Sequence, residues 1–228
     1  SMFGQVIGAE IRGFEEREHE GQAARAVIAE RIYPTDIDDL WDAITNPERL
    51  PRWFLRAHGQ FSEGGRYQLE GNAGGTITKC APPRVLELTW EFGGATSWVL
   101  LRLTPEVAEG ERDGAATRLV LEHVAPVGVA EEHWESFGPS AVGTGWDLAL
   151  MGLGHHIASG GAAIDPQEGQ AWSLTPEGKA FVRTSTQGWA EAHIAAGADA
   201  DVARGMAART AAFYTGESVE ESGKKGAD

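Results

Sequence analysis

Three side chains stand at regular positions within alternating apolar segments, and their types suit them for chemistry. Tyr67, Trp90 and His123 each lie where the two-residue period of a strand points a side chain toward one face. A buried histidine must find hydrogen-bond partners. We therefore interpret His123 as a structural histidine that links strand and helix. A ligand contact, a general base and a metal ligand are the alternatives for it.

The elements that must position these residues are short strands. Residues 84–92, 97–104 and 117–124 each alternate apolar and polar side chains, which is typical of strands with one buried face. Glycine pairs and Pro82-Pro83 separate the strands. The side chains that this alternation points inward include Tyr67, Trp90, Leu101, Leu121 and His123.

A long helix is predicted from about Pro139 to Ile157, because Trp146, Leu150 and Leu153 fall on one stripe. We expect this stripe to face the strands, with a pocket for a small apolar or aromatic ligand between them. The alternative is that these residues fill an ordinary core. Shorter helices are predicted after Thr35, which can cap the first one, and after Asn46, which can cap the second with Pro47 at its first position.

The opposite side of the long helix is also apolar, since Leu148 and Met151 lie there. Four glycines interrupt the same helix, and a glycine in a helix interior costs about 1 kcal/mol relative to alanine. This pattern predicts close packing on both sides, by helices after residue 160 or by a second subunit. The candidate anchors are Trp189 and Phe213. Trp98 marks a second candidate contact patch, because strand alternation points its side chain away from the inward-facing residues.

The chain is predicted to fall into five consecutive parts. A β-meander with a short helical pair and one long helix is an α+β plan. Thr175-Pro176-Glu177 is a strong start for a later helix. The predicted parts are a charged N-terminal segment (1–22), a domain (23–159), a linker (160–174), a helical extension (175–216) and a disordered tail (217–228).

Composition excludes several classes of function. The 228 residues include 19 basic and 34 acidic ones, and the net charge of −15 argues against binding nucleic acid or an anionic membrane. One cysteine, Cys80, permits neither an internal disulfide nor a thiolate zinc cluster. The histidines lack metal-ligand spacing, so no metal and no cofactor are expected. No long apolar run occurs, and a cytoplasmic protein is expected.

Short motifs within residues 23–159 occur in an order that resembles one protein family. They include Leu40-Trp41, Asn46-Pro47-Glu48, Pro82-Pro83-Arg84 and Gly145-Trp146. The chain resembles the family of activator-of-Hsp90-ATPase-homologue-like proteins, which belongs to the START/Bet v 1-like (SRPBCC) superfamily. The resemblance implies a helix-grip fold, in which a curved antiparallel sheet surrounds the long helix and encloses a cavity.

Three functions stay open, because one fold hosts many activities. The first is binding of a small hydrophobic or aromatic ligand. The second is an enzyme of cyclase or hydrolase type that uses His123, and the third is a protein-interaction module with a chaperone-cofactor role. A homodimer is a further possible partnership. A cavity with two or more convergent titratable groups would favour the enzyme, and a dry or purely apolar cavity would favour binding. A filled core with an exposed apolar patch would favour protein interaction.

Overall fold

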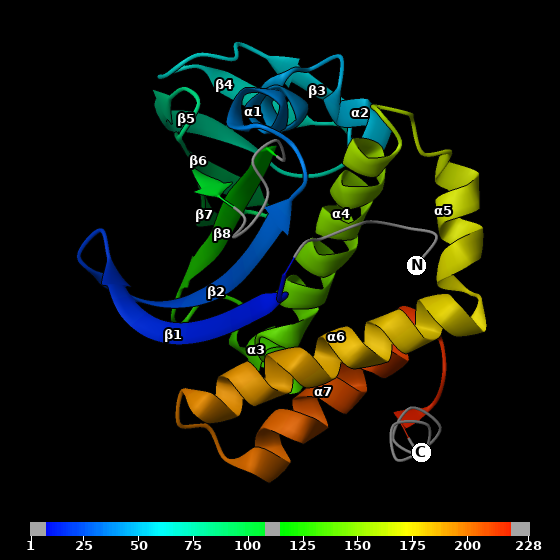
Figure 1. Cartoon of the computed structure of the whole chain (residues 1–228). Coiled ribbons are helices and arrows are strands. Elements are labelled where there is room, and N and C mark those ends of the chain that lie inside the picture. Colours follow the sequence, from blue (N-terminus) through cyan, green and yellow to red (C-terminus); the bar gives the residue numbers. More distant parts are fainter. Residues whose placement is uncertain (1–7, 108–114, 220–228) are drawn as a thin grey trace. The chain divides into compact units, whose positions relative to one another are not determined.

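The computed structural model describes residues 8–107 and 115–219, which form eight strands and seven helices (Figure 1). The strands are β1 (Ile11–His19), β2 (Gln22–Tyr33), β3 (Ala57–Gly59), β4 (Arg66–Leu69), β5 (Gly74–Ala81), β6 (Val85–Phe92), β7 (Ala95–Val107) and β8 (Ala115–Pro126). The helices are α1 (Ile37–Thr45), α2 (Leu50–Trp53), α3 (Glu131–Phe137), α4 (Ser140–Ala158), α5 (Pro166–Ser173), α6 (Pro176–Ala195) and α7 (Ala200–Thr215). Across the described residues, every helix is too short or too polar to span a lipid bilayer. From residue 220 on, the predicted disordered tail lies outside the described residues.

The eight strands form one sheet in the order β1-β2-β8-β7-β6-β5-β4-β3. From β3 to β8, each strand pairs with the next in antiparallel fashion. This confirms the predicted antiparallel meander and the α+β class. Strand β1 stands at one edge of the sheet, so part of the charged N-terminal segment predicted for residues 1–22 is an edge strand.

The first helix begins one residue later than predicted. Asp36 is the N-cap of α1, and its carboxylate accepts a hydrogen bond from the Asp39 backbone N–H at 2.8 Å. The Thr35 hydroxyl instead donates to the Asp39 carboxylate at 2.6 Å. Asn46 ends α1, because its backbone N–H donates to Asp42 O, and it also caps the following turn as predicted, since its side-chain oxygen accepts from the Glu48 N–H at 2.9 Å. Helix α2 starts only at Leu50.

The C-terminal helices follow the predicted pattern with one correction. Thr175 caps α6 and accepts a hydrogen bond from the Gly178 N–H at 3.1 Å, as its sequence context predicts. The segment predicted as a linker, residues 160–174, contains the additional helix α5. Asp165 caps α5 by accepting from the Gln167 N–H at 2.8 Å.

The chain divides into two compact units whose segments interleave along the sequence. The first unit is Ser1–Ile11, Ile28–Ala125 and Ala149–Ile164, and the second is Arg12–Val27, Pro126–Leu148 and Asp165–Asp228. The first unit therefore holds β3 to β8, α1, α2 and the C-terminal part of α4. Whether residues 23–159 fold as a separate domain stays a prediction.

The core of the first unit lies where α1 and the end of α4 meet the strands. Leu40, Leu103, Leu119 and Leu153 are almost completely buried. The hydroxyl of Tyr33, at the end of β2, donates to the Leu150 carbonyl of α4 at 2.9 Å. Burial of such side chains is the main stabilising term of the fold.

Candidate functional site

The registers of β6, β7 and β8 place the predicted inward side chains on one side of the sheet. Leu88 lies opposite Val99, and Val99 lies opposite His123. The neighbouring aligned row consists of Leu86, Leu101 and Leu121. Because directly opposed residues on antiparallel strands share one face, these rows project together. We call that side the inner face.

The centre of the inner face keeps part of its apolar surface accessible. Leu88, Trp90 and Leu101 are only half-buried, although they lie in central strands. Together with Trp41 of α1, they pack against the buried side chains of Ala57, Tyr67, Leu69, Ile77 and Leu86. Apolar side chains that solvent still reaches are surface that a ligand can cover. We call Trp41, Leu88, Trp90, Leu101 and His123 the inner-face patch.

His123 supplies polarity within the inner-face patch. Its Nε2 lies 2.8 Å from the Ser97 hydroxyl oxygen, and its ring meets the Trp90 ring edge-to-face at 5.7 Å. Ser97 also donates toward the Trp90 carbonyl at 3.3 Å. Burial lowers the pKa of His123 to about 4, so its imidazole is neutral near pH 7. The patch therefore carries a neutral hydroxyl–imidazole pair within apolar surroundings.

Ser97 was not among the predicted site residues. It opens the predicted strand 97–104 and shares the parity of Val99 and Leu101. The signal that would have identified Ser97 is a polar residue at a position that strand alternation points inward. The same signal did identify His123.

Tyr67 lies on β4 with its side chain buried, and its hydroxyl is already occupied. The hydroxyl donates to the Thr89 carbonyl at 2.6 Å. Burial raises the pKa of Tyr67 well above its usual value. Tyr67 therefore belongs to the buried cluster against which the inner-face patch packs. Its hydroxyl is not available to a ligand as a donor, because it already donates to a backbone carbonyl.

The helix residues predicted to close the pocket are divided between the two units. Leu150 and Leu153 belong to the first unit and are buried at 3% and 0% exposure. Trp146 belongs to the second unit and is half-buried. Its predicted position opposite the sheet stays a prediction.

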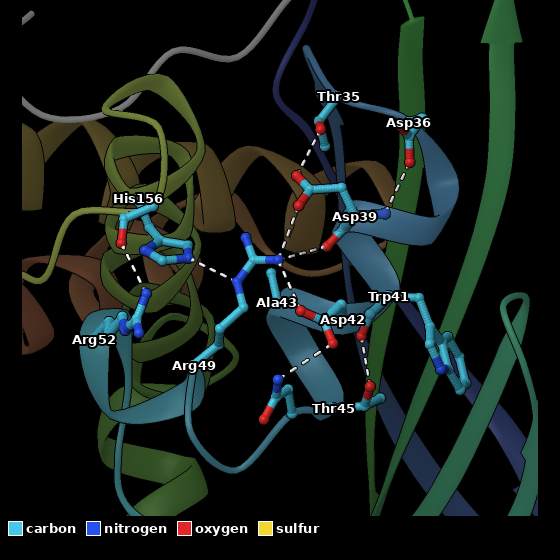
Figure 2. A network of polar contacts seen from close by, with 12 residues as sticks. Thr35, Asp36, Asp39, Trp41, Asp42, Ala43, Thr45, Arg49, Arg52 and His156 are labelled. Carbon is cyan, nitrogen blue, oxygen red and sulfur yellow. Dashed lines mark hydrogen bonds and ion pairs between the residues drawn. The ribbon is translucent and has the colours of Figure 1, made fainter.

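A second polar feature of the first unit centres on Arg49, which follows α1 (Figure 2). Its guanidinium donates from Nη1 to the carboxylates of Asp39, at 2.8 Å, and Asp42, at 3.0 Å. Its Nε donates to His156 Nε2 of α4 at 3.1 Å. The contacts raise the pKa of Arg49 against the opposing effect of burial, so its charge is retained. We call Asp39, Asp42, Arg49 and His156 the Arg49 network.

His156 is completely buried, and its hydrogen bonds fix its tautomer. Because Arg49 has only donors, His156 Nε2 must accept, and Nδ1–H then donates to the Ala162 carbonyl at 2.9 Å. Burial lowers the pKa of His156, which agrees with a neutral ring. The Arg49 network therefore fastens α1, α4 and the segment after α4 together. Both ring nitrogens of His156 and both carboxylates have partners, as expected of a structural network.

The fold and these two features can be compared with known proteins. The model of the family described as Activator of Hsp90 ATPase homolog 1-like protein matches residues 34–158, more than half of the chain. The chain belongs to this family. The matched residues run from the turn before α1 to the end of α4, and they include both the inner-face patch and the Arg49 network. The family resemblance seen in the sequence is thus confirmed.

Two similar solved structures are both of CalU16 from Micromonospora echinospora. Its crystal structure is 32% identical, covers 81% of this chain and 98% of that chain, and has a TM-score of 0.62. Its solution structure is 31% identical, covers 83% and 98%, and has a TM-score of 0.66. No curated protein matches the chain. Since the coverage exceeds residues 34–158, this family member and CalU16 also share elements outside the family model.

In this family member, Asp147 is a buried polar centre of the second unit, and three of its partners lie outside the family match. Its Oδ2 accepts from Arg12 Nε at 2.8 Å, from the Ser185 hydroxyl at 2.6 Å and from Trp189 Nε1 at 3.0 Å. The Ser185 hydroxyl proton is thereby used, so Thr144 donates to Ser185 at 2.9 Å. These contacts join β1, α4 and α6 within the second unit.

The residues predicted as interface anchors have very different exposures. Trp189 is completely buried against α4, whereas Phe213 is 75% exposed. Trp98 is only 7% exposed, so it does not form the exposed patch that its parity suggested. Leu148 and Met151 are half-buried. Among the described residues, Trp189 is thus a packing residue, and Phe213 is a surface residue.

The described residues contain no group of three or more histidine, cysteine or acidic side chains that could hold a metal ion. Cys80 packs at the margin of the buried cluster beneath the inner-face patch, and burial raises the pKa of its thiol. A raised thiol pKa disfavours the thiolate. Cys80 therefore has the character of a packing residue.

Proposed function

We propose that this chain binds a small, neutral, apolar or aromatic ligand on the inner-face patch. The observation that carries the proposal is the half-exposure of Leu88, Trp90 and Leu101 in the middle of the sheet. Covering accessible apolar surface contributes about 25 cal/mol per Å². Trp41 and Trp90 are the largest contributors, because an aromatic side chain can bury about 150–250 Å².

The Ser97–His123 pair supplies the specificity that apolar contact lacks. A neutral imidazole can both donate and accept a hydrogen bond, but it does not attract an anion. A ligand with one hydroxyl, ether or carbonyl group on an otherwise apolar skeleton fits this surface. A few placed polar groups in an apolar surface are the usual makeup of a small-molecule site.

A hydrolase is a second candidate, supported by the 2.8 Å distance between the Ser97 oxygen and His123 Nε2. A serine nucleophile needs an adjacent base to remove its proton. The pKa of His123 near 4 makes its imidazole a weak base at neutral pH, because an effective general base has a pKa near the working pH. Binding therefore fits the geometry better than hydrolysis.

Fluorescence titration with N-phenyl-1-naphthylamine tests the proposal. This neutral aromatic probe becomes bright in apolar surroundings. The full chain should give a saturable signal, and Trp90→Ala should weaken binding by about 10-fold, through loss of about 1–2 kcal/mol of aromatic contact. The control is Phe213→Ala, which removes an exposed aromatic side chain of α7.

The two variants decide between the possible outcomes. Phe213→Ala should bind the probe within about two-fold of the unaltered chain, since one exposed ring contributes little. Equal losses in Trp90→Ala and Phe213→Ala, or a signal that rises without saturation, would contradict the proposal. Circular dichroism of each variant confirms that it is folded.

A further inference from the structure

A pocket of about 500 Å³ lies within the second unit, between β1 and the end of α6. It is lined by Phe14, Glu15 and Glu16 of β1, by His193 of α6, and by residues 196–198. Its size falls within the range of small-molecule sites, about 300–1,000 Å³. All of its residues belong to one unit, and none belongs to the inner-face patch.

Aromatic rings form one side of this pocket. Phe14 stacks on Trp134 with centroids 5.4 Å apart, and the His193 ring meets both of them edge-to-face, at 5.0 and 5.6 Å. On Trp134, the Arg25 guanidinium lies 4.2 Å from the ring centroid. This group of rings therefore already stacks a cation within the fold, as aromatic faces do.

Negative charge surrounds the rest of the pocket. Glu15 pairs with Arg17 and is thereby neutralised, whereas Glu16 is exposed and forms no ion pair among the described residues. The C-terminal end of α6 closes the pocket, and a helix C-terminus carries about half a negative charge. No lysine or arginine stands in the last turn of α6 to offset that charge.

His193, in the wall of the pocket, has a buried ring nitrogen without a hydrogen-bond partner among the described residues. This nitrogen is Nδ1, and the His193 side chain is 9% exposed. Burial lowers the pKa of His193, and Glu16 partly offsets that shift. A neutral imidazole can accept from a donor, and it does not repel a cation as imidazolium would.

We infer that this pocket binds a small organic ammonium ion with an apolar group. Three features support this inference: the carboxylate of Glu16, the C-terminal end of α6 with its partial negative charge, and the aromatic rings of Phe14 and His193. The cationic head lies near Glu16 and the helix end, and the apolar group lies against Phe14. Arg25 does not oppose the ligand, because Glu131 already binds its guanidinium at 2.7 Å. This site is independent of the proposed function of the inner face.

The experiment uses the full chain and follows its backbone amide signals by two-dimensional NMR. The probes are benzyltrimethylammonium, 2-phenylethylammonium and neopentylbenzene, the neutral counterpart of the first. The two cations should shift the signals of residues 14–16 and 193–198 in a saturable manner. Neopentylbenzene should bind at least about 5-fold more weakly, because one ion pair near water contributes about a factor of five.

Three variants locate the site. Glu16→Gln should weaken binding of both cations by about 5-fold or more. Glu18→Gln makes the same change of charge two residues along β1 and should alter affinity by less than about two-fold, because exposed charges are screened at a distance. Ala196→Trp adds a large side chain at an exposed lining position and should abolish the shifts without unfolding the chain.

Several outcomes would overturn the inference. One is that neither cation, at concentrations up to about 5 mM, shifts the amide signals of residues 14–16 and 193–198 in a saturable manner. Binding weaker than this would be too weak to count as a specific site. Another is equal affinity for benzyltrimethylammonium and neopentylbenzene. A third is an equal loss of affinity in Glu16→Gln and Glu18→Gln. That result would show that the cations respond only to the general negative charge of the chain.

Discussion

The Nε–H of Arg49 donates a hydrogen bond to Nε2 of His156 at 3.1 Å and joins residues 107 positions apart. His156 is completely buried, and the same guanidinium binds Asp39 and Asp42. The contact holds the C-terminal end of α4 against the segment between α1 and α2. One arginine therefore fixes several elements of the first unit.

Replacement of Arg49 should destabilise the chain. Arg49→Met leaves a buried imidazole nitrogen without its donor and two carboxylates without their ion-pair partner, which should lower the free energy of unfolding by about 1–3 kcal/mol. Arg49→Lys should recover only part of this loss, because a lysine lacks the forked donors. Urea denaturation measures both. The control is Arg56→Met, whose side chain is 64% exposed, and it should change stability by less than about 0.5 kcal/mol. Equal effects of Arg49→Met and Arg56→Met would contradict the role of the Arg49 network.

The neutral state of His123 predicts a dependence of stability on pH. Its pKa is lowered from 6.5 to about 4, so between these values the unfolded chain binds a proton that the folded chain does not. The stabilising contribution is complete above about pH 6.5 and is lost as the pH falls toward 4, by up to about 1.4 kcal/mol per pH unit.

Urea denaturation between pH 4 and 7.5 checks this dependence. His123→Gln should flatten the fall in unfolding free energy below pH 6.5. Burial lowers the pKa of His156 as well, so only the difference between the two chains reports on His123. Identical slopes would show that His123 titrates near its ordinary value.

Removal of the Tyr67 hydroxyl should affect stability and leave ligand binding intact. Tyr67→Phe leaves the Thr89 carbonyl without the 2.6 Å bond and should cost about 0.5–1.5 kcal/mol. The affinity for N-phenyl-1-naphthylamine should stay within about two-fold, because the hydroxyl faces the backbone. Thermal denaturation and the fluorescence titration test the two parts. A large loss of affinity at unchanged stability would instead place the hydroxyl in the ligand site.

At Gly143, α4 lies close to α6, because an added Cβ would lie 2.2 Å from the Trp189 ring. Alanine normally favours a helix over glycine by about 1 kcal/mol. Here Gly143→Ala should instead destabilise the chain by about 1–3 kcal/mol, since the buried indole must shift.

Gly205→Ala on α7 is the matched control, since its nearest neighbour is the flexible end of Arg209 at 3.4 Å. This variant should be neutral or stabilising by about 0.5–1 kcal/mol. Chemical denaturation of both variants gives the comparison. A stabilised Gly143→Ala chain would show that the helices are not in close contact.

The sequence was sufficient to predict the sheet and the face of its central strands. Alternation alone put Leu101, Leu121 and His123 on one side, because the period of a strand is fixed at two. The glycine-rich character of α4 also indicated its packing against a later helix, and Trp189 is in contact with Gly143. Both inferences rest on local patterns that determine side-chain direction.

Other features depended on contacts between distant residues. Nothing local to Arg49 identifies His156 as its partner, although His156 lies three residues after buried Leu153 and so shares its side of α4. Phe213 is 75% exposed, so its predicted role as an anchor for a second subunit stays a prediction, because sequence alone does not show which apolar residues of a terminal helix pack within the chain. Helix α5 was missed although Asp165-Pro166 is a start signal of the same type as Thr175-Pro176.

Methyl NMR can show directly whether the inner-face patch receives a ligand. In a complex with N-phenyl-1-naphthylamine, we expect intermolecular nuclear Overhauser effects between the probe and the methyl groups of Leu88 and Leu101. Val202 is exposed on α7 and serves as the reference methyl group outside the patch. Effects to Val202 and none to Leu88 or Leu101 would show that the probe binds elsewhere and that the inner-face patch is not a ligand site.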